Sequence, residues 1–205
     1  QVTDMIDNGV DFVASCLDLN AMEKLAREFV RQDYRDQVTL QHPNSYDAGF
    51  QAAAGDLFNG DYVVPQFLPF EWTEDEEIQI FNEWVDAQGT DDIAEQTMIG
   101  WVNADLFVDG LLATGPEFSR EALLTTINTT FTAHNANGLI NPIDWTRQHD
   151  APTPDDRVTN GFVDECFTPL QMQDGVFVTI TDEPWLCWPT SDQTWSEPTP
   201  TDFTG

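Results

Sequence analysis

Short apolar runs alternate with amphipathic segments in the first third of the chain. The apolar runs cover residues 10–14, 38–40 and 62–67. The amphipathic segments between them cover residues 19–32 and 48–57. Strands that alternate with helices at this spacing predict a parallel sheet with right-handed crossover connections. We therefore expect an α/β fold in which the first strand is buried and helices flank the sheet.

The middle of the chain has helical patterns with no strands between them. The three predicted helices cover residues 73–87, 93–113 and 119–130. Thr73 and Glu76 have the spacing of a capping box, Ser119 is an N-cap residue, and Gly115-Pro116 ends the second helix. Because each helix must bury its apolar surface, we expect the three to pack on one another or on a sheet from outside this chain.

A β-hairpin is predicted near the C-terminal end. Apolar segments at residues 167–172 and 176–180 flank Asp174-Gly175, and Asp-Gly between such segments is a strong hairpin signal. Cys166 and Cys187 flank the hairpin near its open end. In an oxidising compartment a disulfide between them would close a loop of about twenty residues and stabilise the fold; two buried thiols are the alternative.

Acidic residues dominate the charge. The 205 residues include 37 Asp and Glu against seven Lys and Arg, which gives a formal net charge of −30. This charge repels nucleic acid and anionic membranes, so we expect no nucleic-acid partner. It suits either a solvated surface in a salty or extracellular environment or a cationic ligand.

No apolar stretch approaches the ~20 residues of a membrane span. The start at Gln1 predicts a processed, excised or truncated chain.

Two strand-to-helix loops, residues 15–20 and 41–47, form the predicted binding site. In an open parallel sheet, ligands bind beyond the carboxyl ends of the strands, where side chains and helix N-termini converge. The candidate ligand-binding residues are Cys16, Asp18, Leu19, Asn44 and Tyr46. Three of them have a structural alternative. Asp18 would cap the helix of residues 19–32, Asn44 or Ser45 would cap the next helix, and Tyr46 would be a packing residue with a solvated hydroxyl.

No metal site, cofactor or catalytic group is predicted. The three cysteines have no zinc-like spacing with the three histidines, and we interpret His42 as a loop residue rather than a metal ligand. Cys16 is expected to be buried, without the histidine that would make it a nucleophile. A hydrolase with paired acids is a further alternative, and the absence of a recognisable motif argues against it. Close pairs of acids carry little information here, because 37 carboxylates guarantee some. We therefore expect that the chain is not an enzyme.

Several strings, taken in order, resemble the type 1 periplasmic binding proteins of ABC importers, in the branch that includes leucine/isoleucine/valine-binding proteins. The strings are residues 9–13 (GVDFV), 16–20 (CLDLN), 66–71 (QFLPFE), 100–112 (GWVNADLFVDGLL), 113–116 (ATGP), 138–145 (GLINPIDW) and 174–177 (DGVF), together with Cys166. The chain is similar to secreted actinobacterial members, and the resemblance covers nearly all of it up to Trp188.

The resemblance implies an incomplete two-lobe architecture, because such proteins are much longer and this chain looks like their C-terminal half. Residues 1–70 would be part of the second lobe, 71–147 would be helices and a strand of the first lobe, 148–188 would be a loop and hairpin returning to the second lobe and hinge, and 189–205 would be an extended acidic tail. A complementary chain or an oligomer would cover the missing half.

The resemblance also implies a function. It predicts an extracytoplasmic protein, secreted or attached to the cell envelope, that binds a small polar solute such as an amino acid or amide for the membrane subunits of an ABC transporter. Asp18 would pair with an ammonium group, and Asn44 with Tyr46 would contact the same ligand. No cofactor is implied. The alternative is a cell-surface interaction or structural subunit that keeps the fold without binding a transport ligand.

Overall fold

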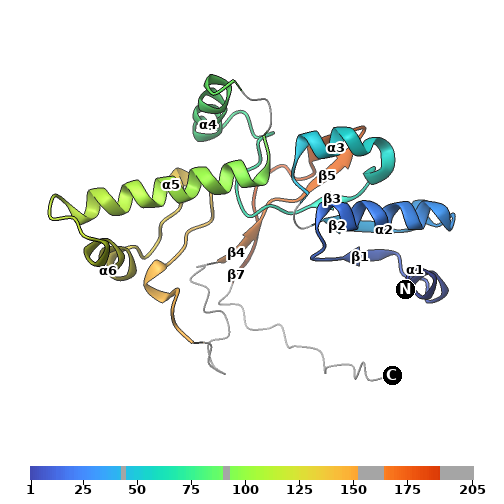
Figure 1. Cartoon of the computed structure of the whole chain (residues 1–205), viewed down its shortest axis with the longest axis horizontal. Coiled ribbons are helices and arrows are strands. Elements are labelled where there is room, and N and C mark those ends of the chain that lie inside the picture. The colour runs from blue at the N-terminus through green and yellow to red at the C-terminus, as the bar shows by residue number, and fades with distance from the viewer. Residues whose placement is uncertain (43–44, 90–92, 152–163, 190–205) are drawn as a thin grey trace.

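A five-stranded mixed sheet lies at the centre of the computed structural model, which describes residues 1–42, 45–89, 93–151 and 164–189 (Figure 1). The strands, in spatial order, are β1 (Phe12–Ala14), β2 (Thr39–His42), β3 (Tyr62–Val63), β5 (Leu170–Gln173) and β6 (Val176–Thr179). β1, β2 and β3 pair in parallel, and β5 and β6 continue the sheet in antiparallel pairing. The predicted α/β sheet and the predicted hairpin are both confirmed.

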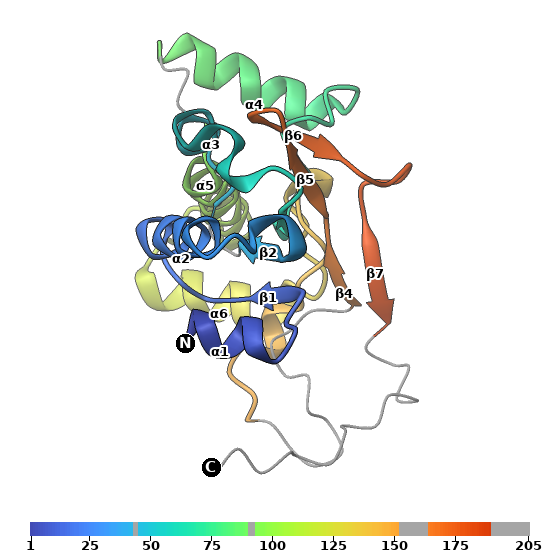
Figure 2. The same cartoon turned by 90° about the vertical axis from the view of Figure 1, so that its right-hand side faces the viewer.

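The five predicted helices are present in the predicted order, and an additional short helix precedes β1. The helices are α1 (Val2–Asp7), α2 (Leu19–Arg31), α3 (Ala48–Ala54), α4 (Glu76–Ala87), α5 (Glu95–Thr114) and α6 (Arg120–Thr130), with short 3₁₀ turns η1 (Arg35–Gln37), η2 (Gly55–Phe58), η3 (Ala136–Gly138) and η4 (Trp145–Arg147). Figure 2 shows α2 and α3 on the same side of the sheet. We call the sheet with α2 and α3 the sheet unit. No described helix has the length and apolar character needed to cross a membrane.

The strands differ from the prediction in two ways. β1 is an edge strand, paired only with β2, and Phe12 on it is 53% exposed, so the expectation of a buried first strand is wrong. The strand predicted at residues 62–67 ends at Val63. Pro65 has no N–H to donate to a sheet ladder, and its carbonyl instead accepts hydrogen bonds from the amide and hydroxyl of Thr168.

Helix starts depend on which polar side chain reaches the free N–H groups. Ser119 caps α6 as predicted, with its hydroxyl accepting from Ala122 N–H at 3.0 Å. The capping box at Thr73 is wrong, because Asp75 caps α4 and the helix begins at Glu76. The cap of α3 is Asp47 rather than Asn44 or Ser45. In both corrected cases an Asp stands immediately before the first helical residue.

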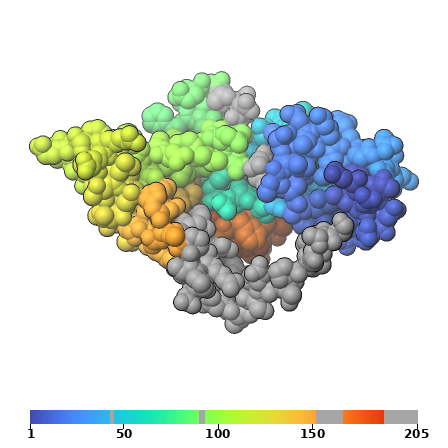
Figure 3. Space-filling model, turned by 60° about the horizontal axis from the view of Figure 1, so that its bottom comes forward, coloured from blue at the N-terminus to red at the C-terminus, as the bar shows by residue number. Residues whose placement is uncertain are grey.

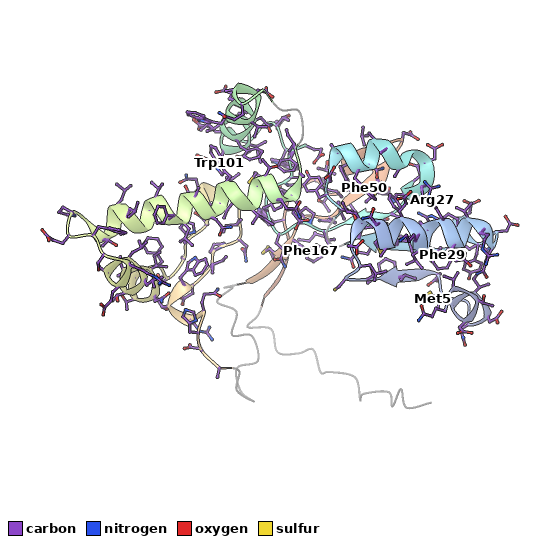
Figure 4. All side chains as sticks on the ribbon, in the orientation of Figure 1. Met5, Arg27, Phe29, Phe50, Trp101 and Phe167 are labelled. Carbon is purple, nitrogen blue, oxygen red and sulfur yellow. A yellow bond between two sulfur atoms is a disulfide. The ribbon has the colours of Figure 1, made fainter. Side chains whose placement is uncertain are left out.

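The core of the sheet unit is closed. Met22 and Phe29 from α2, Leu40 from β2, Phe58 from η2 and Met172 from β5 are all fully buried. Figure 4 labels Phe29 on α2. Burying a side chain of this size contributes about 1.5–3 kcal/mol relative to leaving it exposed, so these residues supply much of the unit's stability.

α5 and α6 form a second part of the molecule, which we call the helical arm. α5 begins beside the sheet and runs away from it, and α6 packs near its far end (Figures 1 and 3). Gly110 allows this packing, because a Cβ there would lie 2.8 Å from side-chain carbons of Leu123 and Ile127. Large apolar side chains remain exposed on the arm and the adjoining loop: Ile99, Phe107, Val108, Leu112, Phe118 and Leu124.

α4 bridges the two parts through aromatic contacts. Phe81 stacks on Phe70 at a centroid distance of 5.5 Å and meets Trp101 of α5 edge-on at 5.6 Å. In Figure 4, Trp101 lies between α5 and α4. Aromatic pairs with these spacings contribute about 0.5–1.5 kcal/mol beyond their buried area. The contacts therefore hold the start of the arm against the sheet unit.

A separate two-stranded ribbon carries the disulfide. β4 (Asp164–Phe167) pairs antiparallel with β7 (Leu186–Pro189), which places Cys166 directly opposite Cys187. Their Cα atoms are 4.0 Å apart, and the two sulfur atoms are bonded. The predicted disulfide is present, although the sequence pattern did not predict the strands that carry it. Pro189, the first residue of the predicted tail at 189–205, is the last residue of β7. The rest of that tail and residues 152–163 of the predicted loop lie outside the described residues.

Candidate functional site

The first predicted loop lies where expected, at the carboxyl end of β1 beside β2. Asp18 is the N-cap of α2, and its carboxylate accepts the Ala21 N–H at 3.0 Å. Leu19 is the first residue of α2 and is half-buried. Cys16 is exposed, so the expectation of a buried thiol is wrong. It is exposed because the loop follows an edge strand that has no neighbour on its outer side.

The second predicted loop leads into a buried aromatic cluster. Tyr46 is 2% exposed, and its ring stacks on Phe70 at 4.8 Å. Its hydroxyl donates to a carboxylate oxygen of Glu71 and accepts the Phe70 N–H at 2.8 Å. The hydroxyl is thus bonded within the protein rather than solvated. Asn44 lies outside the described residues, and the structure tests no ligand contact of either residue.

Burial shapes the titration of this tyrosine and its partner. Desolvation, reinforced by the negative charge of Glu71, raises the pKa of Tyr46 well above its ordinary value. Desolvation also raises the pKa of Glu71, and the hydrogen bond from Tyr46 offsets part of that effect. Tyr46 therefore stays protonated and donates to the Glu71 carboxyl, which fixes the chain between β2 and α3 against the segment that follows β3.

A buried charged group supports the end of β2 directly before this loop. Asp61 accepts the Leu40 N–H at 2.9 Å and lies 2.8 Å from His42 Nε2 and 2.6 Å from Arg35 Nη2. Arg35 also donates to the carbonyls of Leu57 and Val38. His42 is the last residue of β2 and fully buried, so its interpretation as a loop residue is wrong. The group positions the carboxyl end of the strand.

A pocket of about 560 Å³ opens beyond the carboxyl ends of β2 and β3, between the sheet unit and α5. Gln41, the residue before His42, lines it from the sheet side, and Glu95 lines it from the first turn of α5. The full lining is Gln41, Val64, Gln66, Phe67, Glu95, Met98, Ile99, Val102, Asn103, Leu106, His134, Ile140, Ile143 and Trp145. A mostly apolar wall with a few polar groups is typical of small-molecule sites.

Glu95 is the charged carboxylate of this pocket. Its backbone N–H donates to the Tyr46 carbonyl at 2.8 Å, and a β-bridge joins Ala94 to Asp47, so the predicted loop positions the start of α5. Burial raises the pKa of the Glu95 carboxyl above its ordinary value. A desolvated carboxylate in an apolar pocket is suited to pairing with a cationic group of a ligand.

Three metal-ligating side chains meet at one side of the pocket. His134 Nε2 lies 3.1 Å from Asp105 Oδ2 and 3.7 Å from Asp109 Oδ2. One ligand atom from each residue falls within 4.8 Å of the other two. His134 is also a lining residue of the pocket.

The pocket lies at the predicted edge of the sheet, but most of the residues that line it are not the predicted ligand-binding residues. Cys16, Asp18, Leu19 and Tyr46 do not line it, whereas Gln41 from the second predicted loop does. Glu95 and His134 come from segments with no local motif. Glu95 lines the pocket because α5 begins beside the sheet, and His134 lines it because the segment after α6 returns along α5. The available signal for Glu95 was its place in the first turn of a predicted helix. An acidic residue there ordinarily indicates only a favourable interaction with the helix dipole.

Comparisons with known proteins agree with this arrangement. A model of the family described as periplasmic binding protein matches residues 1–161. No curated protein matches the chain.

Three solved structures share the fold. A substrate-binding protein of an ABC transporter from Aeropyrum pernix has a TM-score of 0.66 at 16% identity, with 93% of this chain and 47% of that chain covered. A leucine-binding protein from Thermotoga maritima has a TM-score of 0.62 at 11% identity, with 88% and 46% covered. A solute-binding protein of an ABC transporter from R. palustris, in complex with benzoate, has a TM-score of 0.60 at 14% identity, with 90% and 46% covered.

The present chain thus spans about half the length of these structures. The family match covers well over half of the chain. This chain belongs to the periplasmic binding protein family.

Proposed function

We propose that the chain is the C-terminal portion of an extracytoplasmic solute-binding protein, secreted or attached to the cell envelope, that delivers a small polar solute such as an amino acid or amide to the membrane subunits of an ABC importer. The observation that carries this proposal is the pocket at the carboxyl edge of the sheet, because a parallel sheet exposes its binding groups there. The family match and the named functions of the neighbouring structures support it.

The pocket favours a solute with an amine and an apolar body. The Glu95 carboxylate would pair with the amine, and the amides of Gln41 and Gln66 can each donate and accept hydrogen bonds to the polar remainder. Leucine and benzoate, named for two of the neighbours, both combine a carboxylate with an apolar body. Of these two ligands, only leucine has an amine that can pair with the Glu95 carboxylate. The net charge of −30 also favours a ligand with a cationic group.

The proposal assigns the segments to two lobes. Residues 1–70 and the hairpin within 148–188 would belong to the second lobe, residues 71–147 would belong to the first, and residues 189–205 would be a tail. The exposed apolar side chains of the helical arm and the coverage of about half of each neighbour support a missing first-lobe layer, supplied by a complementary chain or segment. Asp18 and Asn44 would face a ligand only with that layer opposite them.

The second candidate function is a cell-surface interaction or structural subunit that keeps the fold without a transport ligand. The exposed side chains of Phe107, Val108 and Leu112 favour it, because an uncovered apolar surface of this kind marks a protein contact. In that case the arm rather than the pocket would be the functional surface.

Thermal-shift measurements on the native protein with a panel of amino acids and amides test the proposal. We expect at least one amine-bearing apolar solute to raise the melting temperature, because a ligand that binds only the folded state stabilises it. Glu95→Gln should lower the affinity for that solute by at least about tenfold, since the cationic group of the ligand loses its partner. Glu83→Gln, at an exposed position on α4, is the matched control and should leave affinity unchanged.

Absence of any response across the panel would overturn the transport proposal. Self-association or a stable protein complex under the same conditions, lost when Leu112 is replaced by Glu, would then support the interaction subunit. Equal weakening by Glu95→Gln and Glu83→Gln would also count against the pocket, because it would indicate a general effect of acidic charge.

A further inference from the structure

The cluster of Asp105, Asp109 and His134 has the geometry of a divalent metal site. Zinc-type ions bind imidazole nitrogen and carboxylate oxygen at about 2.0–2.2 Å, so ligand atoms at right or tetrahedral angles lie roughly 3.0–3.5 Å apart. His134 Nε2 lies 3.1 Å from the Asp105 oxygen, within that range, and 3.7 Å from the Asp109 oxygen, slightly above it. All three atoms can therefore reach one ion with small side-chain adjustments.

Hydrogen bonding within the protein leaves this histidine incompletely satisfied. The His134 side chain is 6% exposed and presents Nε2 to both carboxylates, but a neutral imidazole has a single N–H to donate. If Nε2 carries that proton, Nδ1 is a buried acceptor with no hydrogen-bond partner among the described residues. If Nδ1 carries it, the Nε2 lone pair faces two negative carboxylates. A cation bound at Nε2 would join all three groups favourably.

The three ligands are held in place before any ion binds. Asp105 and Asp109 lie one turn apart on α5, which puts both carboxylates on one face of the helix. The backbone of His134 exchanges two hydrogen bonds with Ile143, at 3.0 and 2.9 Å, and its ring stacks on Phe131 at 5.9 Å. Little conformational entropy would then be lost on binding.

Access and charge also suit a cation. The Asp109 side chain is 51% exposed and that of Asp105 is 24% exposed, so an ion can enter and keep water ligands in open positions. The imidazole favours a transition metal over Ca²⁺ or Mg²⁺, which prefer all-oxygen sites.

We propose that Asp105, Asp109 and His134 bind a divalent transition metal of the zinc type at the wall of the pocket, and that the ion clamps α5 to the segment after α6. The sequence predicted no such site, because the histidine lies far along the chain from the two aspartates and no ligand motif joins them. The proposal does not depend on the identity of the transported solute.

Titration of the chelator-treated native protein with Co²⁺, followed by visible absorption and calorimetry, tests the site. One Co²⁺ should bind per chain, with the d–d bands of nitrogen and oxygen ligation. Asp109→Asn should weaken binding by at least about tenfold, comparable to the loss seen when even outer-shell groups of metal sites are removed. Asp109 is half-exposed, so this variant should fold normally, and circular dichroism checks that it does.

Two further variants make the result decisive. His134→Gln should abolish the d–d bands, whereas Asp86→Asn, an exposed aspartate on α4, should bind Co²⁺ like the parent. Binding that survives Asp109→Asn and His134→Gln unchanged, or Ca²⁺ and Mg²⁺ binding as tight as Co²⁺, would overturn the proposal. The proposal would also be overturned if Co²⁺ did not bind with a dissociation constant below the millimolar range.

Discussion

The sheet unit and the helical arm differ in how completely each buries its apolar residues. In the sheet unit, Met22, Phe29 and Leu40 are fully buried between α2 and the strands. In the arm, Phe107 is 50% exposed and Leu112 is 76% exposed. The two parts have similar kinds of apolar side chain, so composition does not explain the difference. The sheet unit has both of its packing layers, whereas α5 carries apolar residues around its circumference and has partners on only part of it.

This difference indicates where the stability of the chain resides and where its partners bind. A closed core stabilises the chain by itself. An uncovered helix face contributes to stability only when another surface covers it. The pocket lies at the junction of the two parts, so its shape depends on both. Three changes, in decreasing order of expected effect, sharpen or break this comparison.

The same substitution in each part should have very different costs. Phe29→Ala should lower the free energy of unfolding by about 3–5 kcal/mol, because it leaves a cavity in the closed core. Phe107→Ala should lower it by less than about 1 kcal/mol, since half of that side chain is already in water. Urea unfolding of both variants measures the two costs. Similar costs would show that the arm is covered in solution, for example by a second chain.

Loss of the disulfide should have the next largest effect. The bond between Cys166 and Cys187 encloses β5 and β6, which belong to the sheet unit, within a sequence separation of 21 residues. In the chain-entropy model its removal lowers the free energy of unfolding by about 3 kcal/mol. Paired replacement of both cysteines by serine, compared with the parent in urea, gives the value, and Cys16→Ser is the matched control. A loss in the control as large as in the pair would contradict the assignment.

The smallest effect concerns the junction and depends on pH. The pKa of Glu95 is raised by burial, so the folded chain holds this proton more tightly than the unfolded chain does. Ionisation of Glu95 therefore destabilises the folded chain as the pH rises from 4.5, the ordinary pKa of a glutamate, through the raised pKa. Glu95→Gln should match the parent at low pH and become the more stable of the two toward pH 7.

Unfolding curves of the parent and the Glu95→Gln variant at several pH values measure this difference, with Glu83→Gln as the exposed comparison. Subtracting one curve from the other removes the contribution of the remaining acids, which are common to both proteins. A difference that does not change with pH would show that water reaches Glu95 freely and that the junction is open.

Local patterns predicted a large part of the fold. The βα units, the Asp174-Gly175 hairpin and the Ser119 cap follow from interactions between residues a few positions apart, and all three are confirmed. The capping errors arose where neighbouring residues competed for one role. Asp75 rather than Thr73 caps α4, because a strong cap directly before the helix satisfies the first free N–H groups.

The site was less predictable than the fold. Asp18 was correctly considered as a helix cap, which depends only on the N–H groups that follow it. Tyr46 could not be placed, because its neighbours Glu71 and Phe177 are distant in sequence. Its ligand role, and that of Asn44, stay predictions. The pocket lining combines residues from β2, α5 and the segment after α6, and no pattern within one segment reports such a combination.

The sequence by itself determined the order of most strands and helices and the strongly acidic character, and it predicted the edge of the sheet where a ligand would bind. These depend on backbone periodicity, charge and short-range capping, which any segment of the chain expresses locally. Only the tertiary structure decided that β1 lies at an edge, that Glu95 faces the pocket and that His134 meets Asp105 and Asp109. Those outcomes depend on long-range packing, which brings together residues that have no local influence on one another.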